Sequence, residues 1–248
     1  MKEIKPSYKT EVVYENIQIA NGLFRLTIEG EFNAKPGQFY MLRCPNKEPF
    51  LPRPISINYL DDESISFLYQ VNGEGTQILS NLKQGDELNL MGPLGNGFDI
   101  DKINGKVAIV TGGIGIAPML YTAKNLNHCN VHIYAGFRDK TYILDEFKEY
   151  VEDIRISTET GTEGHKGYVT DLFNPELYDV VLCCGPEIMM NKIIKVCNEK
   201  KVPLYVSMEK HMACGIGACL VCTCKTKHGN KRTCKNGPVF LGEDIVLD

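Results

Sequence analysis

Apolar and polar residues alternate over short runs in the first hundred or so positions, which is the period of half-buried β-strands. Turn residues such as Pro36-Gly37, Asp61-Asp62 and Gln84-Gly85 separate the runs. The predicted strands are Thr10–Ile19, Leu23–Glu29, Gln38–Cys44, Ile55–Leu60, Ser64–Val71 and Glu87–Met91. One short helix is expected after Gly75, where apolar residues lead into Leu82. So many short strands predict a small antiparallel barrel over residues 1–101.

The pattern changes after Asn104-Gly105, where apolar runs of strand length begin to alternate with helical stretches. The predicted strands are Val107–Thr111, Val131–Ala135, Ile154–Thr158, Val180–Cys183 and Leu204–Ser207, and the clearest helices are Pro118–Leu126 and Pro186–Lys200. This alternation predicts an α/β domain over residues 102–208, with a parallel sheet covered on both faces. Residues 209–248 are rich in glycine and cysteine and too few to build an apolar core, so a metal is expected to organise a small C-terminal subdomain.

Composition narrows the class of protein. The chain has 248 residues, of which 43% are hydrophobic and 23% charged, as in ordinary globular proteins. A net charge of −4 gives no reason to expect nucleic-acid binding. The first ten residues lack an apolar segment, and the most apolar stretch, Val107–Leu120, is short and broken by glycine and proline. We therefore expect neither a secretory signal nor a membrane span, but a cytoplasmic protein whose ten cysteines stay reduced.

Half of the cysteines fall in one short segment. Cys214, Cys219 and Cys222 have the spacing C-x4-C-x2-C, and Cys234 follows after eleven residues, which is typical of plant-type [2Fe–2S] clusters. Gly215 and Gly217 would let the backbone wrap closely around the cluster. The alternatives are a structural zinc site, which usually takes two C-x2–4-C knuckles, and a redox dithiol. Cys224 lies two residues beyond Cys222 and competes with it as a ligand, although the spacing favours Cys222.

Two elements of the predicted barrel suit a phosphate group. Arg53-Pro54-Ile55-Ser56 offers an arginine for a pyrophosphate and a serine for the edge of a flavin ring. A buried arginine paired to a carboxylate is the alternative there. Gly73-Glu74-Gly75-Thr76 opens the expected helix, where backbone amides favour an anion. The two elements together favour a flavin.

Two glycine turns follow strands of the α/β domain. The segment from Thr111 to Pro118, TGGIGIAP, opens a helix, which is the context in which a glycine-rich loop binds a dinucleotide. Proline occupies the third glycine position of the usual fingerprint, and a plain tight turn is the alternative. Cys184-Gly185-Pro186 forms the second turn, at the carboxyl end of a strand, where ligands of open α/β sheets bind.

The order of barrel, RPIS, GGIGIAP and CGP resembles the ferredoxin–NADP reductase superfamily over residues 1 to about 208. The segment from Ser207 to Cys219, with the closing run from Cys234 to Phe240, narrows the resemblance. It is similar to the electron-transfer subunits of NAD-dependent (class 1B) dihydroorotate dehydrogenases, over essentially the whole chain.

The resemblance implies FAD, a [2Fe–2S] cluster and NAD(H), in a heterotetramer with the FMN-containing catalytic subunit of dihydroorotate dehydrogenase, an enzyme of pyrimidine biosynthesis. It implies that the flavin is held by Arg53, Pro54, Ile55 and Ser56, the strand end Leu68, Tyr69 and Gln70, and the pair Gly75 and Thr76. The implied nicotinamide pocket consists of Gly113, Gly115, Pro118, Cys184, Gly185 and Glu209. Ser56, Cys184 and Glu209 would lie nearest the chemistry, and the cluster would be bound by Cys214, Cys219, Cys222 and Cys234. Two positions depart from the family, because Gln70 replaces a basic residue and Ile55 an aromatic one.

Glu159 predicts the choice of coenzyme. The strand Ile154–Ser157 runs into Thr158-Glu159, where the superfamily usually binds the 2′-phosphate of NADPH. An acidic residue there repels a phosphate and accepts hydrogen bonds from a ribose diol, which favours NADH, whereas Arg138 and Lys166 favour a phosphate. The competing functions are an NAD(P)H reductase subunit serving ferredoxin, a hydrogenase or a sulfide-linked complex, and a redox sensor without turnover.

Overall fold

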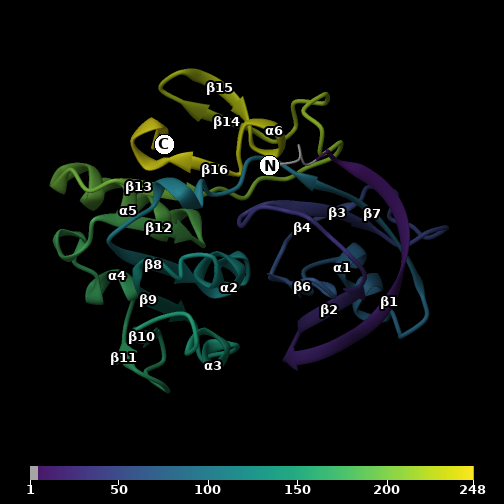
Figure 1. The fold of residues 1–248 in the computed structure, drawn as a ribbon, viewed down its shortest axis with the longest axis horizontal. Coiled ribbons are helices and arrows are strands. Elements are labelled where there is room, and N and C mark those ends of the chain that lie inside the picture. Colours follow the sequence, from purple (N-terminus) through teal and green to yellow (C-terminus); the bar gives the residue numbers. More distant parts are fainter. Residues whose placement is uncertain (1–4, 248) are drawn as a thin grey trace.

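The computed structural model describes residues 5–247, which form two sheets side by side with the C-terminal segment lying across both (Figure 1). The sheet at the right of that view is the predicted barrel, and the sheet at the left is the predicted parallel one. None of the helices within these residues is long and apolar enough to cross a lipid bilayer.

The barrel is antiparallel throughout, with the strand order β4-β3-β7-β1-β2-β6-β5. Its elements are β1 (Ser7–Ala20), β2 (Leu23–Glu29), β3 (Phe39–Arg43), β4 (Arg53–Ser56), β5 (Tyr59–Leu60), β6 (Ser64–Gln70), α1 (Glu74–Ser80) and β7 (Glu87–Leu94). The long strand β1 pairs with β7 up to Val12 and with β2 from Val13 onward, so it curves the sheet around. Side chains such as Leu26, Leu42 and Phe67 fill the interior completely buried. The predicted barrel is confirmed.

One predicted strand, Ile55–Leu60, is in fact two, because the chain changes partners at Ile57 and Asn58. Strand β4 pairs with β3, and β5 pairs with β6 at the other end of the sheet order. Between them the Ile57 amide donates to the Gln38 carbonyl at 3.1 Å, and the Asn58 amide donates to the Ser66 carbonyl at 2.9 Å. The alternation of apolar residues continues through the break, so the sequence pattern does not reveal it.

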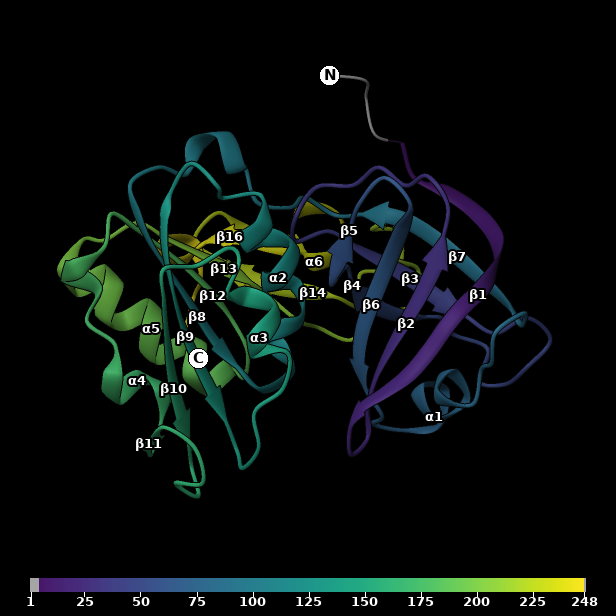
Figure 2. The same ribbon diagram turned by 60° about the horizontal axis from the view of Figure 1, so that its bottom comes forward.

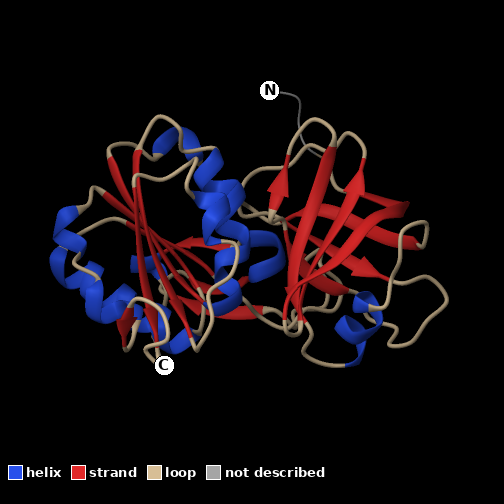
Figure 3. Ribbon diagram, turned by 90° about the horizontal axis from the view of Figure 1, so that it is seen from below, coloured by secondary structure: helices blue, strands red, loops and turns tan. Residues whose placement is uncertain are grey.

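The second sheet has the order β11-β10-β9-β8-β12-β13-β16 and is parallel except for β16. Its strands are β8 (Lys106–Gly112), β9 (Asn130–Phe137), β10 (Asp153–Thr158), β11 (His165–Lys166), β12 (Val180–Cys184), β13 (Leu204–Ser207) and β16 (Val239–Leu241). Helices cover both faces (Figure 3). On one face lie α2 (Ala117–Lys124) and α3 (Leu144–Phe147), and on the other lie α4 (Val169–Leu172) and α5 (Glu187–Lys200). All five predicted strands are confirmed.

Strand order reverses between β8 and β12, because β9 and β10 extend the sheet on one side of β8 whereas β12 and β13 extend it on the other. In open α/β sheets the carboxyl ends of strands at such a switch point form a crevice in which ligands bind. The turns after β8 and β12 are the two glycine turns that the sequence singled out.

The C-terminal segment holds the two sheets together. It contains the hairpin β14 (Thr223–Thr226) and β15 (Gly229–Arg232), the short helix α6 (Thr233–Asn236), and β16, which pairs antiparallel with β13. Cys222 and Cys234 pack against Phe39, Met41 and Leu94 of the barrel. Figure 2 shows this segment behind and between the two sheets. Packing against the barrel and pairing of β16 with β13 therefore stabilise residues 209–247, in addition to any bound metal.

Candidate functional site

The four cysteines of the predicted cluster gather as two neighbouring pairs. The Cys214 thiol lies within hydrogen-bonding reach of the Cys219 side chain, and the thiols of Cys222 and Cys234 have the same relation. Burial and the adjacent Cys222 thiol raise the pKa of Cys234 to about 12. No three His, Cys, Asp or Glu side chains within residues 5–247 converge on a position for a single ion. Two pairs of cysteines match a two-iron cluster, which has one pair on each iron.

Backbone amides point at two of these sulfur atoms. The amides of Ala218 and Cys219 donate to Cys214 Sγ at 3.3 and 3.4 Å, and the amide of Cys234 donates to Cys222 Sγ at 3.4 Å. Burial raises the pKa of Cys214, but backbone amides and the Cys219 side chain outweigh it and lower the pKa to about 6. Amides that stabilise a thiolate also suit a thiolate bound to iron, where they tune the reduction potential.

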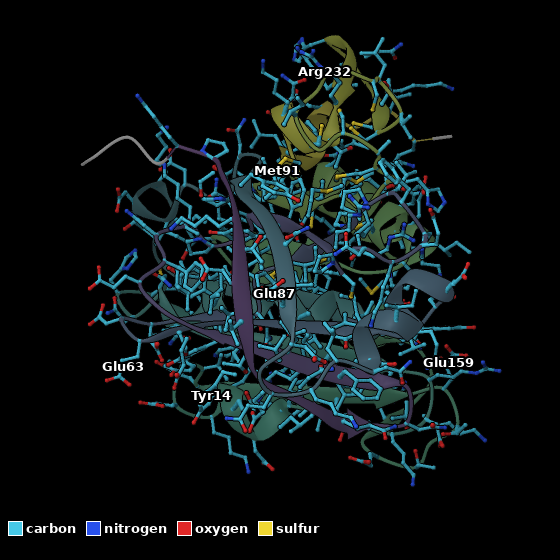
Figure 4. All side chains as sticks on the ribbon, turned by 90° about the vertical axis from the view of Figure 1, so that its right-hand side faces the viewer. Tyr14, Glu63, Glu87, Met91, Glu159 and Arg232 are labelled. Carbon is cyan, nitrogen blue, oxygen red and sulfur yellow. The ribbon has the colours of Figure 1, made fainter. Side chains whose placement is uncertain are left out.

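Two glycines allow the loop to lie close to its neighbours. Gly215 has φ +68°, and a Cβ there would lie 2.8 Å from Met41 Cγ of β3. Gly217 has φ +82°, and its Cβ would lie 2.9 Å from Lys235 Cδ. In Figure 4 the labelled Met91 lies beneath the segment that carries Arg232, on the barrel side of the loop. The residues present therefore fit the predicted cluster.

Cys224 is a fifth thiol in the same neighbourhood. It lies in β14 opposite Lys231 and is buried. Burial raises its pKa, and the adjacent Thr233 side chain partly offsets this. Cys222, and not Cys224, completes the C-x4-C-x2-C spacing with Cys214 and Cys219. The assignment of Cys222 as the ligand stays a prediction.

The structure brings together the two phosphate-suited elements of the barrel. A Cβ at Gly75 would lie 2.6 Å from Arg53 Nη1, so the guanidinium lies directly over the start of α1. Arg53 Nη2 donates to the Leu51 carbonyl, and no ion pair joins Arg53 to a carboxylate within the described residues. A shallow pocket beside them is lined by Leu42, Arg43, Lys47, Leu51, Arg53 and Gly75. A guanidinium over a helix start fits a flavin pyrophosphate.

Strand β4, which carries Arg53 to Ser56, ends the barrel's strand order, and its residues are half-buried. An edge strand presents backbone amides and carbonyls that no neighbouring strand takes up. The polar edge of a flavin ring needs such partners. Ser56 lies opposite Phe39 in the pairing with β3.

The other predicted flavin residues contribute less through their side chains. Tyr69 is buried in the barrel, where its hydroxyl donates to Asn16 Oδ1 at 3.1 Å and its ring stacks on Phe24. Leu68 is buried between the barrel and the second sheet, whereas Gln70 is exposed. The Thr76 hydroxyl accepts from the Asn72 amide at 2.8 Å and donates to the Gly73 carbonyl at 3.0 Å. At Leu68 and Tyr69 only the backbone is available to a ligand.

The two glycine turns of the second sheet touch through their backbones. A Cβ at Gly115 would lie 2.4 Å from the Cys184 carbonyl oxygen, and a Cβ at Gly185, where φ is +155°, would lie 2.8 Å from the Gly112 nitrogen. Residues Gly113–Ile116 form a 3₁₀ turn that leads into α2, with the buried Pro118 in its first turn. The predicted helix start is confirmed, and the loops meet at the switch point, as a dinucleotide site requires.

Cys184, Ser207 and Glu209 gather at the carboxyl ends of β12 and β13. Cys184 is buried opposite Ser207. Burial, followed by the charge of Glu209, raises the pKa of the Cys184 thiol well above its usual value, while Ser207 opposes the shift. The thiol is therefore neutral at physiological pH. Glu209 keeps a solvent-exposed surface but is closely surrounded by protein, and this desolvation raises the pKa of its carboxyl group.

The region predicted to select the coenzyme lies at the carboxyl ends of β9 and β10. Glu159, Arg138 and Lys166 are all exposed there, and Figure 4 shows Glu159 far from Arg232 of the cluster segment. The structure adds a residue that the sequence analysis missed. Asp139 Oδ1 accepts from the hydroxyl of Thr160, the residue after Glu159, at 2.9 Å, so a second carboxylate belongs to this region. The sequence signal that could have identified Asp139 is its position shortly after a predicted strand, next to Arg138.

Comparison with known proteins assigns the chain to a family. Residues 209–246 match the family model described as the iron-sulfur cluster binding domain of dihydroorotate dehydrogenase B. The chain is 61% identical, over 99% of its length and 100% of the relative's, to the dihydroorotate dehydrogenase B (NAD(+)) electron transfer subunit of Clostridium acetobutylicum. It belongs to this family. The corresponding subunit of Clostridium perfringens is 54% identical over 94% of this chain and 96% of its own.

Solved structures agree with this family assignment. A structure described as an NADH-dependent reduced ferredoxin-NADP oxidoreductase is 30% identical, with a TM-score of 0.85 over 95% of this chain and 89% of that one. A ferredoxin NADP+ reductase from Neisseria gonorrhoeae is 15% identical, with a TM-score of 0.61 over 77% of this chain and 91% of that one, and it supports the fold alone. The predicted family, fold class and cofactor set of FAD, an iron–sulfur cluster and NAD are confirmed.

Proposed function

We propose that this chain takes electrons from NADH onto FAD and passes them through its [2Fe–2S] cluster to the FMN of a dihydroorotate dehydrogenase catalytic subunit. One observation carries the proposal: the cluster loop packs on the barrel and is continuous with β16 of the nucleotide sheet. All three candidate sites therefore belong to one packed framework. When bound, FAD supplies the conversion of a two-electron hydride into single electrons.

The residues of the chain would have distinct roles. Arg53, lying over Gly75, binds the flavin pyrophosphate, and Ser56 on the edge strand donates a hydrogen bond to the flavin ring. Gly115 and Gly185 let the two turns approach each other, so that their backbones together line the nicotinamide nucleotide. Cys184, held as a neutral thiol, lines the nicotinamide position without competing as a nucleophile.

The surface around the cluster supports a protein partner. Cys219 is exposed, and next to it Ile216, Leu220 and Val221 are 56%, 61% and 56% exposed. Large apolar side chains clustered at the surface mark interaction sites. We infer that the FMN-containing catalytic subunit docks here, that the complex is a heterotetramer, and that it works in the cytoplasm.

Co-purification followed by a two-stage assay tests the function. In the first stage, NADH added without oxygen to the loaded chain should bleach the flavin absorbance and then the cluster absorbance. Electrons run along the same path in reverse when dihydroorotate is oxidised, so in the second stage the complex with its partner should form orotate from dihydroorotate while NAD⁺ is reduced. A complex that lacks this activity but reduces a ferredoxin would contradict the proposal and favour the ferredoxin-linked alternative. A flavin that NADH does not reduce would favour the sensor alternative.

We further propose that Glu159 selects NADH over NADPH. Its exposed carboxylate lies at the β9–β10 end of the crevice, where it would repel a 2′-phosphate and accept hydrogen bonds from a ribose diol. Steady-state kinetics should show higher kcat/KM for NADH, and Glu159→Arg should shift the ratio toward NADPH about tenfold or more. Glu163→Arg, in the same loop, is the matched control and should change the ratio less. An unchanged ratio in Glu159→Arg would remove this role.

A further inference from the structure

Helix α2 joins the nucleotide loop to the barrel through one of its faces. Ala117, Tyr121 and Lys124 are spaced one helical turn apart along it. The Tyr121 hydroxyl donates to the Ala34 carbonyl at 3.1 Å. Lys124 Nζ donates to the Tyr59 hydroxyl at 2.8 Å and to the Leu60 carbonyl at 3.1 Å. The helix that follows the glycine turn is therefore fastened to the barrel along its length.

Asn58 lies at the centre of this contact and is completely buried. Its side-chain Nδ2 donates to the Ala117 carbonyl at 2.8 Å, and its own carbonyl accepts from the Tyr121 amide at 3.0 Å. Its backbone amide donates to the Ser66 carbonyl at 2.9 Å. One residue thus hydrogen-bonds to the barrel and to two successive turns of α2.

The covalent path from Asn58 to both candidate cofactor sites is short. Two residues before it lies Ser56, at the end of the edge strand β4. Its partner Ala117 directly precedes Pro118 of the glycine turn. A shift of Asn58 relative to Ala117 would therefore move the flavin strand and the nucleotide loop apart. The connecting segments are too short to absorb such a shift.

We propose that Asn58 is a positioning residue that fixes the flavin-binding strand against the nucleotide loop and so sets the approach of the nicotinamide to the flavin. The inference rests on the proposed roles of β4 and of the glycine turn. The rate of transfer between two bound groups depends steeply on their relative position, and a displacement of about 1 Å can lower this rate about 10²-fold. Because Asn58 touches neither cofactor site directly, its loss should alter the approach of the two groups more than their binding.

The Asn58→Ala variant of the full chain, loaded with FAD and cluster, tests this role. It removes the Nδ2 donor and leaves the backbone hydrogen bonds of residue 58 in place. We expect FAD and iron contents equal to wild type and an NADH dissociation constant within about threefold. In anaerobic stopped-flow experiments, hydride transfer at saturating NADH should be about tenfold slower or more. The long-wavelength charge-transfer absorbance between NADH and flavin, which reports their stacking, should weaken.

Tyr121→Phe is the matched control, because it removes one side-chain hydrogen bond from the same interface and leaves the hydrogen bonds of Asn58 in place. It should keep the wild-type rate and charge-transfer absorbance. If Asn58→Ala fails to fold, Asn58→Leu is measured instead, since it keeps the approximate size of the side chain and removes the Nδ2 donor to the Ala117 carbonyl without burying a charge.

A wild-type rate of hydride transfer and wild-type charge-transfer absorbance in the Asn58 variant would overturn the inference. So would loss of folding or of FAD in both variants, because Asn58 would then hold the barrel together rather than set an approach. Failure of the proposed function looks different, because NADH would then not reduce the flavin of the wild-type protein.

Discussion

The cysteines of the C-terminal segment differ in the groups that surround their sulfur atoms. Cys222 Sγ accepts from the Cys234 amide and lies beside the Cys234 thiol, whereas Cys224 is buried in the hairpin near Thr233. We therefore expect Cys224→Ser to retain full iron content, visible absorbance and the spin signal of the reduced cluster. Cys222→Ser, the matched change two residues away, should lose most of the iron. The opposite result would make Cys224 the ligand.

Arg53 offers a second residue-scale test. Its guanidinium over Gly75 is proposed to bind the flavin pyrophosphate, and a charge-assisted hydrogen bond is worth about 1.5–3 kcal/mol. Arg53→Ala should therefore raise the FAD dissociation constant by about tenfold to a hundredfold, measured by flavin fluorescence on titration of the apoprotein. Arg25→Ala is the control, because this barrel arginine pairs with Glu146 at 2.6 Å. Equal FAD affinity in both variants would remove the role given to Arg53.

At the scale of elements, the nucleotide site depends on two turns that meet without side chains. A Cβ on Gly115 would press on the Cys184 carbonyl and force the ends of β8 and β12 apart. Gly115→Ala should lower the free energy of unfolding by about 1–3 kcal/mol, as overpacking does, and slow flavin reduction by NADH while FAD and iron stay bound. Gly229→Ala, at a hairpin tip with φ +87° and open space around it, should leave reduction by NADH unchanged. Normal NADH kinetics in Gly115→Ala would show that the turns do not form the site.

For the molecule as a whole, the apolar residues beside Cys219 are expected to bind the partner. Leu220→Asp should weaken the complex with the catalytic subunit at least tenfold by calorimetry, because a charge would be buried in an apolar contact. Reduction of a small artificial acceptor by NADH should not change. Ile188→Asp makes the same change at an apolar residue that is 77% exposed on α5. Equal weakening by both variants, or by neither, would place the partner elsewhere.

The sequence by itself determined the kinds of element, their order and the chemistry that they carry. Strand and helix periods are local, so alternation in residues 1–101 and the strand–helix pattern in 102–208 were enough to predict both sheets. Cysteine spacing is also local, which is why C-x4-C-x2-C by itself indicates a cluster. The domain boundaries and the roles of individual site residues stay predictions.

Contacts between residues distant in sequence were decided only by the tertiary structure. The approach of Arg53 to Gly75, of Gly115 to Cys184, and of Asn58 to Ala117 each joins segments that no local pattern relates. The same holds for β16, whose three residues find a place beside β13 because that edge of the parallel sheet is open. Asn58 reads as an ordinary polar residue within a strand pattern, and only the change of partners at the barrel's closure turns its side chain toward α2. Periodicity records which face of an element is buried, whereas the packing of complete sheets decides what that face touches.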